Sequence, residues 1–133
     1  MENEKKIKVV LLEPGKLARA VEIDASLAGM QKVVGGLIEP FYPFEEQVCI
    51  VCNEESKING MRPNRSVKND DGVMVDFIFG PAFICDCRGE NLDSLSDEQI
   101  DRYGKMFRFP EHIAKINDTL LGIPYRPQQE QER

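Results

Sequence analysis

The chain has 133 residues, of which 23 are acidic and 17 are basic, so its formal net charge is −6. This length is enough for one domain and excludes two of ordinary size, and a domain of this size folds without a metal or a disulfide. The negative charge argues against a general grip on nucleic-acid backbone, which requires clustered lysine and arginine, so direct nucleic-acid binding is not expected.

The first forty residues predict two strands and a helix. Residues 7–12 are β-branched and leucine-rich, Pro14-Gly15 suits the centre of a type II turn, and residues 17–23 alternate with period two. Apolar side chains then recur at helical spacing within residues 24–40, at Leu27, Met30, Val34 and Leu37.

The middle of the chain predicts strands separated by one long polar connection. Residues 47–53 (QVCIVCN) predict a short strand, and residues 54–72 are polar and rich in turn residues. Connections of this length in a compact domain are often functional. Residues 73–87 are strand-like but are interrupted at Gly80-Pro81, which predicts a bulge, a kink or a turn because proline lacks the ladder donor.

The clearest local signal is the start of a second helix at Ser96. Ser96 as N-cap and Gln99 three residues later form a capping box, and Leu95 and Ile100 form a hydrophobic staple around it. This pattern predicts a helix that begins directly after Ser96.

The order of these elements predicts the domain division and the fold class. Residues 1–109 are expected to form a single domain, residues 110–124 a helical extension packed on it, and residues 125–133 a disordered polar tail. The predicted fold class is α+β, with a four- to five-stranded antiparallel or mixed sheet and two main helices on one face. No apolar run approaches the roughly 20 residues of a membrane-spanning helix, and the N-terminus lacks the apolar segment of a secretory signal. A cytoplasmic location without membrane association is therefore expected.

The four cysteines are weak candidates for a zinc site; they are Cys49, Cys52, Cys85 and Cys87. A zinc CxxC normally lies on a tight turn, whereas the spacer here is Ile50-Val51, which favours an extended chain. In an extended chain, residues three apart point to opposite faces and residues two apart share a face. At most three thiols are therefore expected to converge, buried core thiols are the favoured interpretation, and no metal or other cofactor is predicted.

Basic side chains gather in one place, the segment INGMRPNR within the long connection. Its candidate partner-binding residues are Asn59, Gly60, Arg62, Asn64 and Arg65. Two guanidinium groups three residues apart are suited to clamping a carboxylate or phosphate on a protein partner. The alternative is that asparagine and glycine make turns while the arginines pair with local acids such as Glu54 and Glu55.

Acidic residues near the second helix form a candidate acidic surface: Glu90, Asp93, Asp97, Glu98 and Asp101. The favoured interpretation is that these residues stabilise the start of the helix and lie on its solvent-exposed face. The single histidine, His112, has no visible nucleophile or carboxylate partner, and the chain contains no GxGxxG, P-loop or HExxH pattern. The sequence therefore predicts no enzymatic activity.

The segments KVVLLEPGKLARAVEIDASLAGMQKVVGGLIEPF, INGMRPNR, GPAFI and SLSDEQIDRYGKMF occur in this order within residues 6–109. Together they resemble a family of small uncharacterised domains, the domain-of-unknown-function family numbered three-eight-four-six. The resemblance implies a setting in Firmicutes, often with plasmids, integrative elements and phages, and it supplies no catalytic residues because the family has no established activity. The family pattern is not defined by cysteines, but it does include the loop around Asn59, Gly60, Asn64 and Arg65.

These observations leave three functions open. The first is an accessory protein of a mobile genetic element that acts through contacts with an unknown protein partner. The second is an anti-defence inhibitor that uses its acidic surface to mimic nucleic acid on a host nuclease. The third is a small-ligand or metal-binding domain that uses the arginine loop or the cysteines.

Overall fold

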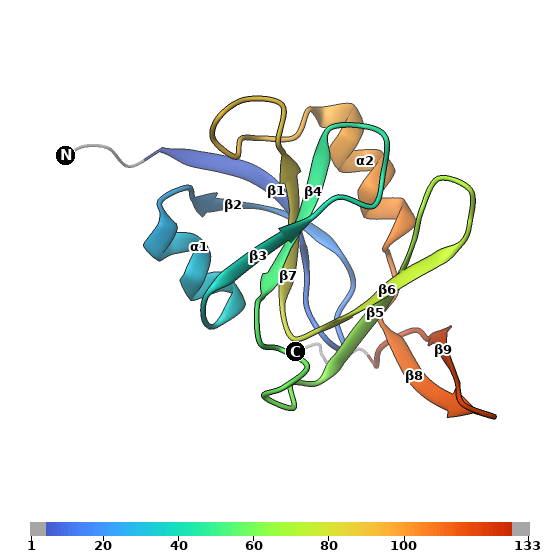
Figure 1. Cartoon of the computed structure of the whole chain (residues 1–133). Helices are drawn as coiled ribbons and strands as arrows, with labels where there is room; N and C mark the ends of the chain where they lie inside the picture. The colour runs from blue at the N-terminus through green and yellow to red at the C-terminus, as the bar shows by residue number, and fades with distance from the viewer. Residues whose placement is uncertain (1–4, 129–133) are drawn as a thin grey trace.

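The computed structural model describes residues 5–128 and is built around a five-stranded antiparallel sheet (Figure 1). Its strands are β1 (Lys6–Leu12), β2 (Arg19–Asp24), β3 (Ile38–Phe41), β4 (Val48–Asn53) and β7 (Ala82–Asp86), in the order β2-β1-β7-β4-β3. Every neighbouring pair of strands runs antiparallel. The predicted α+β class is therefore supported, and the predicted sheet, which was to have four to five strands in an antiparallel or mixed arrangement, has five antiparallel strands.

The two helices cover opposite faces of this sheet, so the prediction that both lie on one face is wrong. The helices are α1 (Leu27–Val34) and α2 (Asp97–Met106). Val34 of α1 packs in the same cluster as Val9, whereas Tyr103 of α2 packs in the cluster that contains Val10. The central strands are apolar at consecutive positions, and alternate side chains of a strand point to opposite faces. Both faces of the sheet must therefore be covered.

Both helices begin at a serine cap. The capping box predicted for α2 is confirmed: Ser96 Oγ accepts a hydrogen bond from the Gln99 backbone N–H (3.1 Å), and Gln99 Oε1 accepts one from the Ser96 N–H (2.9 Å). In α1 the Ser26 Oγ accepts a hydrogen bond from the Gly29 N–H (3.0 Å), without the reciprocal bond of a capping box, and this helix ends at Gly35, whose φ is 83°. α1 is therefore shorter than the sequence indicated, and Pro40 lies instead in the edge strand β3, where a missing donor is tolerated. Of the two helices in residues 5–128, neither has the length and hydropathy to cross a membrane.

A second, two-stranded sheet packs on the α2 face of the first. Its strands are β5 (Pro63–Lys68) and β6 (Met74–Phe79). Val67 and Ile78 of this sheet join the same core cluster as α2. Strand β5 lies inside residues 54–72, the segment that was predicted to be a loop. The strand was not predicted because several of its buried side chains are polar, which is typical of a loop sequence. Gly80-Pro81 connects β6 to β7 with Gly80 at φ 76°, so it is a turn between strands of different sheets.

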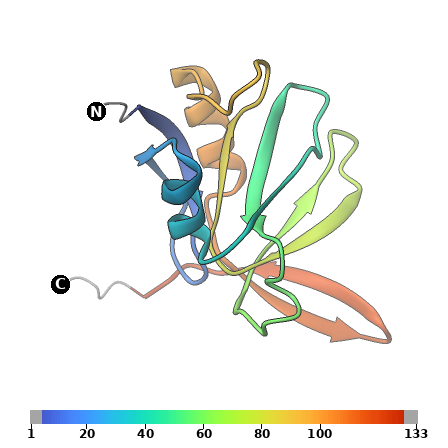
Figure 2. The same cartoon turned by 60° about the vertical axis from the view of Figure 1, so that its left-hand side comes forward.

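The segment after α2 is a β-hairpin, so the predicted helical extension over residues 110–124 is wrong. Its strands are β8 (Glu111–Ile116) and β9 (Thr119–Pro124). They are joined by Asn117 and Asp118, whose φ values are 51° and 67°. Positive φ at both central residues characterises a type I′ turn, whose twist matches that of a two-stranded ladder. The hairpin projects from the body of the molecule in both views (Figures 1 and 2).

The first residues of the predicted tail pack against the molecule. The Tyr125 ring stacks on His112 with the ring centroids 4.0 Å apart, and the Arg126 guanidinium lies 5.3 Å from the centroid of the Phe109 ring. The prediction of a disordered tail is therefore wrong for Tyr125 and Arg126, and residues 129–133 lie outside the described part of the chain.

Candidate functional site

The five candidate partner-binding residues divide into an exposed group and a buried group. Asn59, Gly60 and Arg62 are exposed on the connection between β4 and β5. Asn64 and Arg65 lie in β5 and are 0% and 1% exposed. The expectation that the two guanidinium groups face a partner together is therefore wrong, since only that of Arg62 is open to solvent.

The guanidinium group of Arg65 ties separate backbone segments together. Its Nε donates a hydrogen bond to the carbonyl oxygen of Phe107 (2.7 Å), and its Nη1 and Nη2 donate to those of Glu13 (3.2 Å) and Lys16 (2.6 Å). Burial lowers the pKa of Arg65 to about 10, so the group stays charged at neutral pH. Arg65 therefore joins β5 to the β1–β2 turn and to the end of α2, which is a structural role.

The candidate acidic residues do not form one unpaired patch. Three of them form ion pairs with basic side chains: Asp93 with Lys5 (3.4 Å), Glu98 with Arg102 (3.5 Å) and Asp101 with Lys105 (3.1 Å). Within residues 5–128, Glu90 and Asp97 have no ion pair, and Asp97 lies in the first turn of α2, where the helix dipole favours negative charge. This pairing weakens the case for mimicry of a phosphate backbone.

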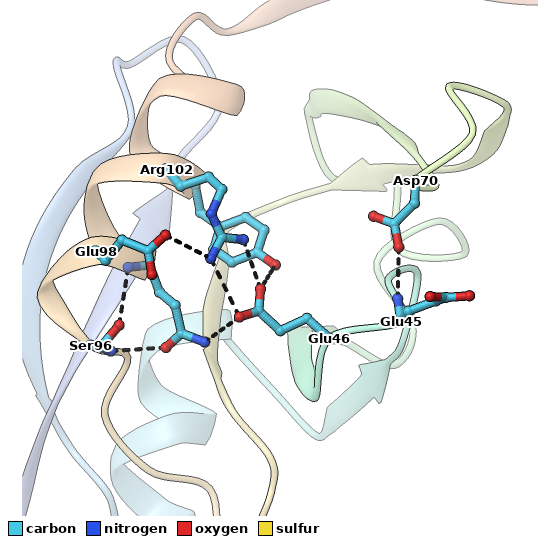
Figure 3. Close-up of polar contacts among 8 residues, drawn as sticks. Glu45, Glu46, Asp70, Ser96, Glu98 and Arg102 are labelled. Carbon is cyan, nitrogen blue, oxygen red and sulfur yellow. Dashed lines mark hydrogen bonds and ion pairs between the residues drawn. The ribbon is translucent and has the colours of Figure 1, made fainter.

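The Glu46 side chain forms a group of polar contacts with α2 that was not predicted from the sequence. Its carboxylate accepts hydrogen bonds from the Tyr103 hydroxyl (2.6 Å), the Gln99 side-chain amide (2.7 Å) and the Arg102 guanidinium (2.7 Å), as Figure 3 shows. The hydrogen bond from Arg102 is the largest cause that lowers the pKa of Glu46 to about 2. All three donors come from α2, while Glu46 precedes β4, so the contact fastens the helix to the sheet.

The cysteines divide between the two faces of the sheet, as the strand geometry predicted. Cys49 and Cys85 are directly opposite each other in β4 and β7, and their Sγ atoms are 3.8 Å apart. Cys87 packs in the same cluster, whereas Cys52 packs on the other face. Burial raises the pKa of Cys52 and of Cys87 to about 11, which keeps both thiols protonated at neutral pH. In the described part of the chain, no three His, Cys, Asp or Glu side chains are placed to hold a metal ion.

Hairpin β8–β9 carries a group of exposed apolar side chains. Between 38% and 51% of the surface of each is exposed; they are Ile116, Leu120, Leu121 and Ile123. Ile116 pairs with Thr119, so Ile116, Leu121 and Ile123 lie on one face of the hairpin and Leu120 lies on the other. We call Ile116, Leu121 and Ile123 the apolar hairpin face. The hairpin was not predicted from the sequence, although asparagine and aspartate are residue types that favour the positive φ values of a type I′ turn.

The comparison with known families covers the sheets and the helices but not the hairpin. Residues 7–108 match the family described as Domain of unknown function (DUF3846), which confirms the resemblance inferred from the sequence. No curated protein and no solved structure matches the chain. The matched span extends from β1 to the end of α2 and stops before β8. The chain therefore belongs to the DUF3846 family.

Proposed function

We propose that the protein is a non-enzymatic accessory protein of a mobile genetic element, and that it acts by protein–protein contact through the apolar hairpin face. The mobile-element setting rests on the family resemblance. The contact surface rests on one observation, the exposure of Ile116, Leu121 and Ile123 on a hairpin that projects from the molecule (Figure 2).

The shape and the composition of this hairpin favour a partner. An isolated two-stranded hairpin buries little apolar surface and is marginal in water. Contiguous apolar patches on a protein surface commonly mark sites of interaction, whereas scattered single residues do not. Leu121 and Ile123 are neighbours because residues two apart in a strand share a face. Ile116 lies diagonally across the ladder from Leu121, since Leu121 pairs with Ala114, two residues before Ile116.

Nucleic-acid mimicry receives less support from the same structure. A mimic has to present unpaired carboxylates to a basic binding site, and three of the five candidate acids are already paired with lysine or arginine. The proposed arginine clamp likewise has only one of its two guanidinium groups exposed, because Arg65 is buried. We therefore favour the apolar hairpin face over the candidate acidic residues and the arginine loop as the contact surface.

A comparative capture experiment tests the proposal. Wild-type protein and a Leu121→Ser, Ile123→Ser variant are immobilised on a resin and incubated with a host lysate, and the bound proteins are quantified by mass spectrometry. A Val73→Ser, Val75→Ser variant is the matched control, because it removes similarly exposed aliphatic side chains at β6. We expect the hairpin variant to lose at least nine-tenths of a captured protein that the control retains, a tenfold change that corresponds to about 1.4 kcal/mol. Equal capture by both variants would contradict the proposal, provided that their circular dichroism spectra match that of the wild type.

A further inference from the structure

A cleft lies between β3, the edge strand of the large sheet, and β6. Its volume is about 250 Å³, and its lining includes Glu39, Phe41, Glu54, Ser56, Asp76 and Phe77. No residue of the β8–β9 hairpin lines it. Since a water molecule takes about 30 Å³ in the liquid, the cleft has room for a ligand of roughly eight to ten non-hydrogen atoms.

The cleft carries an excess of negative charge. Asp76 binds the ammonium group of Lys57, with 2.7 Å between Oδ1 and Nζ, so these two lining charges offset each other. The carboxylates of Glu39 and Glu54 have no ion pair and no hydrogen bond to any of residues 5–128. Two unpaired carboxylates among the residues that line one cleft favour a positively charged occupant.

Ser56 provides an independent indication of a ligand. The residue is 5% exposed, and its hydroxyl forms no hydrogen bond with any other residue in the described part of the chain. Buried hydroxyl groups in proteins almost always have a hydrogen-bond partner, and an unpartnered one is unfavourable. Because Ser56 lines the cleft, a polar group of a ligand in the cleft would supply the missing partner.

Two aromatic side chains also line the cleft. Phe41 comes from β3 and Phe77 from β6, so the two rings belong to different sheets on either side of the cleft. Aromatic faces attract organic cations and also bury flat apolar groups. An aromatic wall beside unpaired carboxylates is a combination suited to an amine with an apolar body.

We propose that this cleft binds a small organic ammonium ion with an aromatic body. Glu39 and Glu54 would neutralise the ammonium group, Ser56 Oγ would accept a hydrogen bond from it, and Phe41 and Phe77 would contact the ring. This site is separate from the apolar hairpin face, so either assignment stands if the other fails.

The test is an NMR titration of uniformly ¹⁵N-labelled protein with 2-phenylethylammonium as the probe. Phenylacetate, which has a similar body and the opposite charge, is the matched ligand. We expect saturable shifts confined to residues around the cleft, with a dissociation constant of about 1 mM for a ligand of this size, and no saturable shift with phenylacetate. No saturable shift with the amine, or equal binding of phenylacetate, overturns the proposal.

Variants identify the groups that bind the cation. Replacement of Glu39→Gln together with Glu54→Gln should weaken amine binding at least tenfold, and Ser56→Ala should weaken it severalfold. The control variant, Glu90→Gln with Asp118→Asn, removes the same charge at exposed positions outside the cleft lining and should bind as the wild type does. If the control loses as much affinity as the Glu39 and Glu54 variant, the binding reflects only the overall charge and the assignment is wrong.

Discussion

The five-stranded sheet and the C-terminal hairpin contain the same kinds of apolar residue, but the sheet buries these side chains and the hairpin leaves them exposed. The valine, isoleucine and leucine side chains of β1, β4 and β7 are buried on both faces, under α1 on one side and under α2 and β5–β6 on the other. Those of β8–β9 stay largely exposed, although this hairpin has a complete antiparallel ladder. A two-residue turn brings two strands into register, whereas burial of their side chains requires segments from distant parts of the chain. A complete ladder in this protein therefore does not imply that its side chains are buried.

The two regions also differ in how they are held. Each central strand of the large sheet has hydrogen-bonded neighbours on both sides, whereas the hairpin forms its own sheet. The hairpin is positioned by Glu111 Oε1, which accepts hydrogen bonds from the N–H and the hydroxyl of Ser66 in β5 (2.8 and 2.7 Å). The Tyr125 ring adds its stack on His112. A few polar contacts thus locate the hairpin without covering its apolar side chains.

The largest expected effect comes from Arg65→Ala, because Arg65 joins β5 to the β1–β2 turn of the sheet and to the end of α2, from which the chain continues into the hairpin. Its guanidinium binds the carbonyl of Phe107, at the end of α2 before the hairpin, and those of Glu13 and Lys16 beside the sheet. Phe107 is buried, and leaving its carbonyl without a donor costs about 1–3 kcal/mol. The loss of the two other hydrogen bonds and of the packing of a fully buried side chain adds to this, so we expect a loss of about 3–5 kcal/mol in the free energy of unfolding. Urea denaturation measures it. Arg62→Ala, at an exposed position, should change stability by about 0.5 kcal/mol or less.

A result within about 1 kcal/mol of the wild type for Arg65→Ala would contradict the structural role assigned to this residue. Arg65→Lys sharpens the test, because lysine keeps the charge but lacks the planar fork that reaches several acceptors at once. We expect it to recover less than half of the stability lost in the alanine variant.

The second prediction concerns Glu46, which fastens α2 to the five-stranded sheet and has no part in the hairpin. The pKa of Glu46 in the folded state is about 2, below its ordinary value of 4.5, because it binds Arg102 and Tyr103. A lowered folded-state pKa stabilises the protein above the ordinary value, and this stabilisation is lost as the pH falls from 4.5 towards 2. Because the Glu46 side chain is 35% exposed, solvent screening reduces the contribution to about 1–2 kcal/mol.

Urea midpoints measured between neutral pH and pH 2 test this prediction. The wild type should lose the stabilisation over the acid range, and Glu46→Gln should lack that part of the pH dependence. Glu98→Gln is the control, since Glu98 contacts the same Arg102 at 3.5 Å but its side chain is 80% exposed. The same acid slope in Glu46→Gln and in the wild type would mean that other groups cause it.

Ser96→Ala should cost about 1 kcal/mol, because it removes the N-cap of α2 and one half of the capping box. Ser96→Asp keeps an acceptor at this position and adds a favourable charge at the helix N-terminus, so it should retain most of the stability. Thermal or urea denaturation monitored by circular dichroism measures both variants. An unchanged midpoint for Ser96→Ala would show that the cap contributes nothing to the stability of the sheet side.

The sequence predicted the sheet more reliably than the hairpin, and particular residues show why. The capping box at Ser96 and the apolar runs of the central strands are local signals that agree with the tertiary structure. In the hairpin, Ile113, Ile116 and Leu120 are three and four residues apart, which imitates the spacing of a helix face. The positive φ values at the turn decide the outcome, and side-chain spacing does not report them.

The roles of Arg65 and Glu46 were harder to predict, because the groups with which they form hydrogen bonds are distant from them in the sequence. Arg65 looked exposed in a polar segment, yet the carbonyl that its Nε reaches belongs to a residue 42 positions later. Glu46 lies 53 positions from Gln99, one of its partners. No spacing rule connects such residues, so only the fold distinguishes a buried structural arginine from an exposed binding one.

A small expected effect on stability, that of Leu121→Ala, tests the comparison directly when it is measured against the matched substitution of a buried leucine in the sheet. Leu12 in β1 is 0% exposed, so Leu12→Ala should cost about 2–5 kcal/mol through lost burial and the cavity left behind. Leu121 in β9 is 38% exposed, so Leu121→Ala should cost about 0.5 kcal/mol or less. Urea denaturation at two protein concentrations measures both. If Leu121→Ala costs as much as Leu12→Ala, and the cost rises with protein concentration, then a second copy of the chain covers the apolar hairpin face in solution. A small cost at both concentrations would instead leave that face free for a different protein.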